Sequence, residues 1–304
     1  MFKTNKKDDT VEESRELLVV NMPYEDGGGF KSGGGAAGAP KAIEQEIKRW
    51  PWRQSEDGYP VKFRFIDIPG EGKNLLDNFS RVMSRRLNQN EKRICVVGGD
   101  NSISFHSAFE LWKYEPNYGL ILFDRHPDCA EAFTDQGEEK DPHAYWLAAL
   151  VGIGRMNPIL DPKKTVLLGI GDSEKNEEAF LKQHKIKNYK ISSLRNYTHV
   201  LIPALYDEIL NNKVLNIKSW GAIHIVIDVD VMTASEVPAT GVRRGGGLNS
   251  GEMINFIKMV KLFIREAGIK TEVWNLVEAR VDKEKDPGMI TIVNAASLLY
   301  EIAA

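Results

Sequence analysis

The chain of 304 residues has few cysteines and no long hydrophobic run. Its 2 cysteines, Cys95 and Cys129, cannot supply a disulfide framework. No segment approaches the ~18 consecutive apolar residues that a membrane span requires. Residues 1–16 are charged and lack the apolar stretch of a signal peptide. We therefore expect a cytoplasmic protein rather than a disulfide-rich secreted protein or a membrane protein.

The chain also has no large excess of charge of one sign, because its 40 Lys and Arg residues nearly balance its 43 Asp and Glu residues. The net charge of -3 provides no basic field for nucleic acid or for an anionic membrane. Hydrophobic residues make up 42% and charged residues 27%, which is ordinary for a globular protein. We interpret residues 1–16 as a flexible N-terminal tail and residues 17–304 as a single domain, since no repeat or interdomain linker interrupts them.

Short apolar runs recur along the chain, and amphipathic segments separate many of them. Several runs, such as ICVV, LILF, TVLLGI and IHIVID, are nearly continuous, which is typical of strands covered on both faces of a parallel sheet. The alternation of strand and helix predicts an α/β fold with a mostly parallel sheet of about eight strands. The predicted strands are residues 17–21, 61–68, 94–97, 119–124, 165–170, 186–191, 222–228 and 271–277.

Acidic residues follow two of these strands directly. One strand continues into Asp124, His126 and Asp128, and another into Asp228 and Asp230. Alternate residues of an extended chain share a face, so each set can point in one direction at the carboxyl end of its strand. Ligands of open α/β sheets bind at this edge. The two sets therefore predict a polar site there.

Carboxylates at the end of an apolar strand repel one another and resist loss of water. A lysine or arginine network can compensate this charge, but a divalent cation does so for several oxygens at once. Either acidic motif alone also occurs without a metal. Their combination with a Gly-Gly-Asp turn after a third strand favours a metal site, and oxygen ligands with one imidazole favour Mn²⁺ or Mg²⁺ over Zn²⁺.

Five motifs in their order resemble the arginase family, which includes arginases, agmatinases and formimidoylglutamases. They are VVGGDNS, FDRHPD, IDVDVMTASEVPATG, GGGLNSGEM and NLVEAR, and the resemblance extends over residues 17–302. It implies a three-layer arginase-like α/β fold and two manganese ions per chain. The implied ligands are Asp124, Asp128, Asp228 and Asn101 at what we call the first metal position, and Asp124, His126, Asp228 and Asp230 at the second metal position.

The resemblance also implies a hydrolase that cleaves a linear C–N bond of a guanidino or formimino compound, with a metal-bridged hydroxide as nucleophile. Asp128 would pass a proton to the leaving amine, and His143 would exchange protons with solvent. Glu278 would bind the cationic end of the substrate, and Glu174 and Arg155 are further candidates for substrate contacts. Relatives commonly form trimers or hexamers, so a homo-oligomer is expected.

The sequence departs from the family pattern at several positions. Asn101 stands where most members have a histidine ligand, which predicts a weaker first metal position. Thr233 replaces a third aspartate. The loop of residues 130–142 is acidic and lacks the arginine expected to bind a glutamate carboxylate in formimidoylglutamases, so Arg155 and Arg280 are its possible substitutes.

These departures leave alternatives open. The acidic loop suits a cationic substrate such as that of agmatinases, whereas the GGDNSIS segment resembles formimidoylglutamases. A metal-poor paralogue that acts as a binding or partner subunit is the main alternative to an enzyme. A deacetylase of acetylated polyamines is a third hypothesis, disfavoured because no histidine pair adjoins the metal motifs. The sequence does not decide the substrate, the number of metals or the oligomeric state.

Overall fold

The computed structural model describes ten stretches of the chain, and the structural statements below concern those residues. They are 16–25, 35–50, 54–55, 58, 60–130, 142–152, 157–171, 173–197, 202–241 and 245–304.

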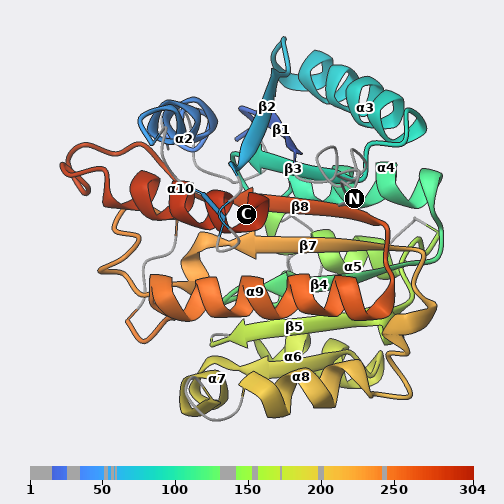
Figure 1. Ribbon diagram of the computed structural model, residues 1–304. Helices are drawn as coiled ribbons and strands as arrows, with labels where there is room; N and C mark the ends of the chain where they lie inside the picture. The colour runs from blue at the N-terminus through green and yellow to red at the C-terminus, as the bar shows by residue number, and fades with distance from the viewer. Residues whose placement is uncertain are drawn as a thin grey trace, which may run out of the picture.

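The centre of the fold is a sheet of eight strands, in which every neighbouring pair is parallel (Figure 1). The strand order is β2-β1-β3-β8-β7-β4-β5-β6. This arrangement confirms the predicted parallel sheet and its number of strands. The strands are β1 (Glu16–Met22), β2 (Lys62–Asp67), β3 (Arg93–Gly98), β4 (Tyr118–Phe123), β5 (Thr165–Ile170), β6 (Lys187–Lys190), β7 (Ala222–Asp228) and β8 (Thr271–Val277).

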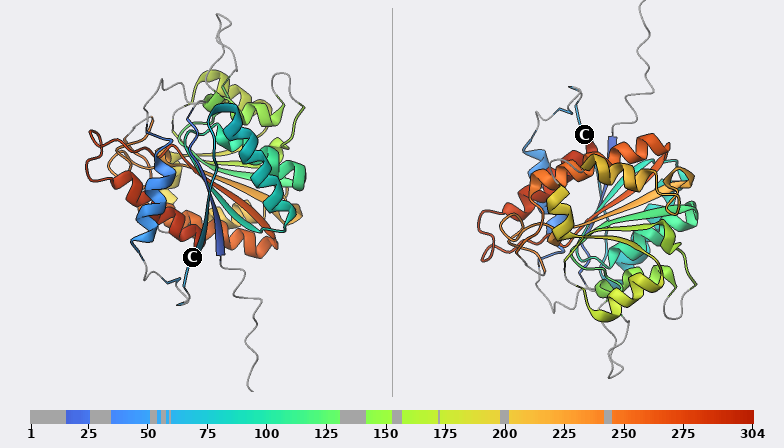
Figure 2. Two further views of the ribbon diagram at one scale, coloured as in Figure 1. Left: turned by 90° about the horizontal axis from the view of Figure 1, so that it is seen from above. Right: turned by 90° about the horizontal axis from the view of Figure 1, so that it is seen from below.

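Helices cover both faces of the sheet, which gives three layers (Figure 2). Residues of α2, α7, α8, α9 and α10 pack in the hydrophobic core of one face, and residues of α3, α4, α5 and α6 pack in the core of the other. The helices are α2 (Ala39–Lys48), α3 (Gly72–Asn88), α4 (Ile103–Tyr114), α5 (Trp146–Val151), α6 (Lys175–Gln183), α7 (Ile191–Tyr197), α8 (Ile202–Leu210), α9 (Ser250–Ala267) and α10 (Ile290–Ala303).

The central strands divide their side chains between these two cores. In β4, Ile121 and Phe123 belong to one core, while Leu120 and Leu122 belong to the other. All four side chains are fully buried. This is why the strand sequences are nearly continuous apolar runs instead of alternating patterns.

Helix α9 begins with a capping box. The side chain of Asn249 accepts a hydrogen bond from the Glu252 N–H at 2.9 Å, and the Glu252 side chain accepts one from the Asn249 N–H at 2.8 Å. This reciprocal capping box satisfies two amide groups that a helix start otherwise leaves without partners. Gly268 ends the helix with φ of 71°, a conformation that glycine adopts without strain.

The register of the central strands brings the polar motifs to one edge. Phe123 pairs with Ile227, so the residues that follow β4 lie beside the end of β7. Asp228 pairs with Val277, and Val97 of β3 pairs with Leu276 of β8. Strands β3, β8, β7 and β4 are consecutive in the sheet, and their carboxyl ends therefore form one site. Among the described residues, no helix is both long and apolar enough to cross a membrane.

Candidate functional site

Three side chains at this edge can offer ligand atoms to one cation. Asp124 follows β4 directly, and Asp230 lies in the short 3₁₀ helix η4 (Val229–Val231) after β7. The Nδ1 atom of His126 lies 3.0 Å from Oδ2 of Asp230 and 3.7 Å from Oδ1 of Asp124. One ligand atom from each of the three lies within 4.8 Å of the others. The structure thus brings together three of the four residues predicted for the second metal position.

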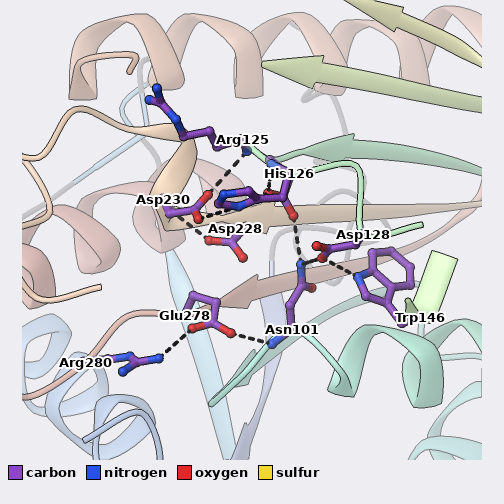
Figure 3. Close-up of polar contacts among 10 residues, drawn as sticks. Asn101, Arg125, His126, Asp128, Trp146, Asp228, Asp230, Glu278 and Arg280 are labelled. Carbon is purple, nitrogen blue, oxygen red and sulfur yellow. Dashed lines mark hydrogen bonds and ion pairs between the residues drawn. The ribbon is translucent and has the colours of Figure 1, made fainter. Parts of the chain in front are cut away.

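Backbone amides hold these carboxylates in place. The His126 N–H donates to Oδ1 of Asp124 at 2.6 Å, and the Asp230 N–H donates to Oδ1 of Asp228 at 2.9 Å. The Arg125 N–H donates to Oδ1 of Asp230 at 3.3 Å. In Figure 3 the Arg125 side chain points away from the acidic group, while its backbone N–H contacts Asp230.

The amide of Asn101 links two of the predicted carboxylate ligands, Asp124 and Asp128. Asn101 donates through Nδ2 to Oδ2 of Asp124 at 2.9 Å and to Oδ2 of Asp128 at 2.7 Å. Its Oδ1 accepts a hydrogen bond from Ser104 Oγ at 2.8 Å. Asn101 therefore presents an NH₂ group, not an oxygen, to the two carboxylates (Figure 3). The first metal position is arranged for hydrogen bonding, whereas the second has the charge and donor types that suit a divalent cation.

Trp146 at the start of α5 is a site residue that sequence analysis missed. Its Nε1–H donates to Oδ2 of Asp128 at 2.7 Å, and its side chain is buried. Asp128 itself has φ of 50°, in the left-handed region that non-glycine residues seldom adopt. The only sequence signal for Trp146 is its position three residues after His143, on the turn leading into α5.

Burial raises the pKa of three carboxyl groups of the site, those of Asp124, Asp128 and Asp228. It raises the pKa of Asp124 and Asp228, and repulsion from neighbouring carboxylates raises both further. It raises the pKa of Asp128 to about 7, against the opposing effects of His126, Trp146 and His143. Buried carboxylates that repel one another are stabilised by added positive charge, which a bound divalent cation supplies.

An ion pair of Glu278 and Arg280 lies beside Asn101. Glu278 follows β8 with φ of 62°, and its Oε1 accepts a hydrogen bond from the Asn101 N–H at 3.0 Å. Its Oε2 accepts one from Nη2 of Arg280 at 3.2 Å. Burial raises the pKa of Glu278, and the charge of Arg280 is the strongest opposing influence. The structure therefore places Glu278 at the site and gives it a partner within the chain.

The turn before Asn101 requires glycine. A Cβ atom on Gly99 would lie 1.6 Å from the carbonyl oxygen of Tyr24, which accepts a hydrogen bond from the Asp100 N–H at 3.0 Å. The carbonyl oxygen of Gly99 accepts a hydrogen bond from the Glu278 N–H at 2.8 Å. The Gly-Gly-Asp motif is thus explained by close backbone approach that positions Asn101 and Glu278.

Of the other predicted site residues, the structure describes His143 and Glu174 but not Arg155. His143 lies half-buried in the 3₁₀ helix η1 (Pro142–Ala144), close enough for its charge to lower the pKa of both Asp128 and Glu278. Glu174 precedes α6, and its N–H donates to Oε2 of Glu177 at 2.9 Å, a capping contact. Its predicted contact with substrate stays a prediction. Arg155 and the acidic residues 131–141 lie outside the described residues.

Comparison with known proteins gives several arginases among the relatives. An arginase of Staphylococcus aureus strain MRSA252 is 28% identical over 211 residues, which are 63% of this chain and 67% of that protein. An arginase of Staphylococcus aureus strain COL is 30% identical over 172 residues, 54% of either chain. The aligned region thus spans only 54% to 67% of the length of these relatives.

Solved structures show the same fold. A formimidoylglutamase from Bacillus subtilis superposes with a TM-score of 0.77 at 22% identity, over 95% of this chain and 85% of that one. An arginase from Bacillus cereus superposes with a TM-score of 0.76 at 22% identity, over 95% and 98% of the two chains. Such identities support the fold alone. The sequence profile of the arginase family matches residues 15–304, and the chain therefore belongs to that family.

Proposed function

We propose that this protein is a manganese-dependent hydrolase of a linear C–N bond in a guanidino or formimino compound. The observation that supports this most is the group of Asp124, His126 and Asp230, whose ligand atoms converge at the carboxyl edge of the sheet. The reaction adds water across the bond, so a guanidino substrate yields an amine and urea. A formimino substrate yields an amine and formamide.

Manganese is proposed because the donor set consists of carboxylate oxygens and one imidazole. Asp124, His126, Asp228 and Asp230 would hold it at the second metal position. Asp124, Asp128 and Asp228 would hold a weaker ion at the first, where Asn101 would have to rotate its amide to present Oδ1 as a ligand. When bound, divalent ions of this kind polarise water towards a nucleophile at neutral pH and balance the charge of the buried carboxylates.

The chain's own residues supply proton transfer and positioning. Asp128 has a pKa raised to about 7, which is suited to accepting a proton and returning it to a leaving amine near neutral pH. Trp146 and Asn101 both donate to its Oδ2 and hold it in one orientation. His143 lies near enough to exchange that proton with solvent, and Glu278 would bind the cationic amidine end of the substrate.

The proposed activity is tested with purified protein, with and without added Mn²⁺. Arginine, agmatine, 4-guanidinobutanoate and N-formimidoylglutamate are each supplied, and urea, formamide and the amine product are measured. We expect release from at least one compound, enhanced by Mn²⁺ and abolished by a chelator. Release that is unaffected by chelation contradicts the metal part of the proposal, and no release from any compound contradicts the activity.

The Asn101→His variant tests the first metal position. An imidazole is a stronger ligand for Mn²⁺ than an amide that donates to Asp124 and Asp128, so we expect this variant to bind a second ion about tenfold more tightly or better. Calorimetric titration of the metal-free protein with Mn²⁺ measures this directly. Asn101→Ala, which removes the amide without adding a ligand, is the matched control. Equal affinities of wild type and Asn101→His would contradict the assignment of Asn101.

A further inference from the structure

Asp128 has two hydrogen-bond donors on the same oxygen. Nδ2 of Asn101 and Nε1 of Trp146 each contact its Oδ2 atom at 2.7 Å (Figure 3). A carboxylate oxygen has two acceptor positions, so these two donors use Oδ2 fully. Two neutral groups of the chain thus hold a carboxylate that was predicted to serve the first metal position.

The same amide group links Asp128 to Asp124. Nδ2 of Asn101 also donates to Oδ2 of Asp124 at 2.9 Å, so its NH₂ group contacts both Oδ2 atoms. A cation shared by these two oxygens would have to displace the NH₂ group. Ser104 opposes this displacement, because its Oγ donates to Oδ1 of Asn101 at 2.8 Å and rotation of the amide would break that bond.

The backbone around Trp146 fixes its contact with Asp128. The Trp146 side chain is 1% exposed, and the Leu147 N–H donates to the carbonyl oxygen of Asp128 at 3.0 Å. The Ala130 N–H donates to the carbonyl oxygen of Ala144 at 3.1 Å. These two backbone bonds tie the turn that carries Asp128 to the start of α5, which sets the indole N–H beside the carboxylate.

The second metal position is arranged differently. Among the described Asp, Glu, His and Cys residues, one group has ligand atoms close enough to share an ion, and it consists of Asp124, His126 and Asp230. Asp128 is not a member of this group. The described part of the chain therefore offers a convergent set of such ligands for one ion, at the second position.

We infer that Trp146 is a positioning residue that acts with Asn101 to close the first metal position, so that the enzyme works with one ion, at the second position. Hydrogen-bond donors favour the charged form of a carboxylate as a nearby cation does, which is why the two N–H groups can take the place of an ion beside Asp128. Oδ1 of Asp128 is then left for proton transfer. An ion binds weakly at the first position because it must displace these donors. This inference rests on the proposed function and restricts it to a single ion.

The number of working ions is tested by the electron paramagnetic resonance spectrum of wild-type protein that has been loaded with Mn²⁺ and desalted. We expect the hyperfine pattern of isolated Mn²⁺, because a single ion in each chain has no neighbour to couple with. The spectrum of an exchange-coupled Mn²⁺ pair would overturn the inference.

The role of Trp146 is tested in a variant that can bind a second ion. Trp146→Phe keeps an aromatic ring, removes the N–H donor and is combined with Asn101→His. In calorimetric titrations with Mn²⁺, we expect the double variant to bind the second ion about tenfold more tightly than Asn101→His alone. Equal or weaker binding would overturn the role, because replacing a residue that supports a metal ligand lowers the affinity for the metal.

Trp274→Phe in the Asn101→His background is the matched control. Trp274 is also fully buried, and its Nε1 donates to the buried carboxylate of Glu272 at 2.9 Å, at the amino end of β8 and away from the site. It should leave the affinity for the second ion unchanged. An equal effect of both tryptophan replacements would indicate a general consequence of lost packing and would also overturn the role of Trp146.

Failure of the proposed function has a different result. If wild type hydrolyses none of the tested compounds, that function is wrong, while the spectrum and the titrations still decide the inference because neither depends on turnover. Thermal unfolding reports whether each variant folds. Trp146→Leu, which also lacks the N–H donor, supplies the comparison if the phenylalanine variant does not fold.

Discussion

The Asp228→Asn variant is expected to lose catalysis while its metal-free form becomes more stable than the wild type. Asparagine keeps an oxygen that can accept the hydrogen bond from the Asp230 N–H but removes the negative charge. Because Asp228 is proposed as a ligand at both metal positions, we expect kcat for urea or formamide release to fall by about a thousandfold or more.

The expected gain in stability comes from the removal of the same negative charge. Asp228 is 4% exposed, and burial and the charges of Asp230 and Glu278 raise its pKa. Removing a buried carboxylate from among others relieves repulsion in the metal-free protein. Thermal unfolding in a chelator at pH 8, together with steady-state kinetics in Mn²⁺, measures both effects. Asp77→Ala, on the exposed face of α3, is the matched control and should change neither. Retained activity in Asp228→Asn would show that its charge is not part of the catalytic site.

The second large effect is stabilisation by Mn²⁺ that grows with pH. Burial raises the pKa of Asp128 from 3.8 to about 7, so the folded protein binds more protons than the unfolded chain between these values. The contribution of Asp128 to the stability of metal-free protein is therefore fully present below about pH 4 and is lost as pH rises through about 7. Asp124 and Asp228 act in the same direction, because their pKa values are also raised.

Mn²⁺ should reverse this loss. A ligand at a hundred times its Kd stabilises the folded state by about 2.7 kcal/mol. For a chain of this size, that corresponds to a rise in Tm of roughly 5 °C. We expect this rise at pH 8 and little at pH 5, where protons compete with the metal for the carboxylates. Thermal scans at both pH values, with Ca²⁺ as a control for general ionic effects, measure it. A rise that is equal at the two pH values would contradict the linkage.

The sheet was predictable because its signal lies within each strand. The runs that form β5 and β7 are mostly apolar, and the observed bounds of β5, β7 and β8 agree with the predicted ranges. Polar side chains directly after β4 and β7 also indicated the site, since parallel strands end at the same edge. The order of the strands was not predictable in this way, because it depends on pairings between distant segments such as β3 with β8.

Side-chain contacts within the site were less predictable than its location. Asn101 was identified as a weak ligand. Its Nδ2 donates to Asp124 and Asp128 because Ser104 donates a hydrogen bond to its Oδ1, and this contact with Ser104 was not predicted. Trp146 contacts Asp128 across 18 residues of sequence. Arg280 was named as a possible carboxylate-binding residue, and the structure pairs it with Glu278. The left-handed backbone conformation of Glu278 was not indicated by any sequence pattern.

The central claim is that the buried carboxylates at the ends of β4 and β7 bind metal. The most direct test is the metal content of the protein, measured by plasma mass spectrometry after incubation with Mn²⁺ and desalting. We predict one retained ion per wild-type chain, at the second metal position, and close to two in Asn101→His. Wild-type protein that retains no ion would contradict the claim.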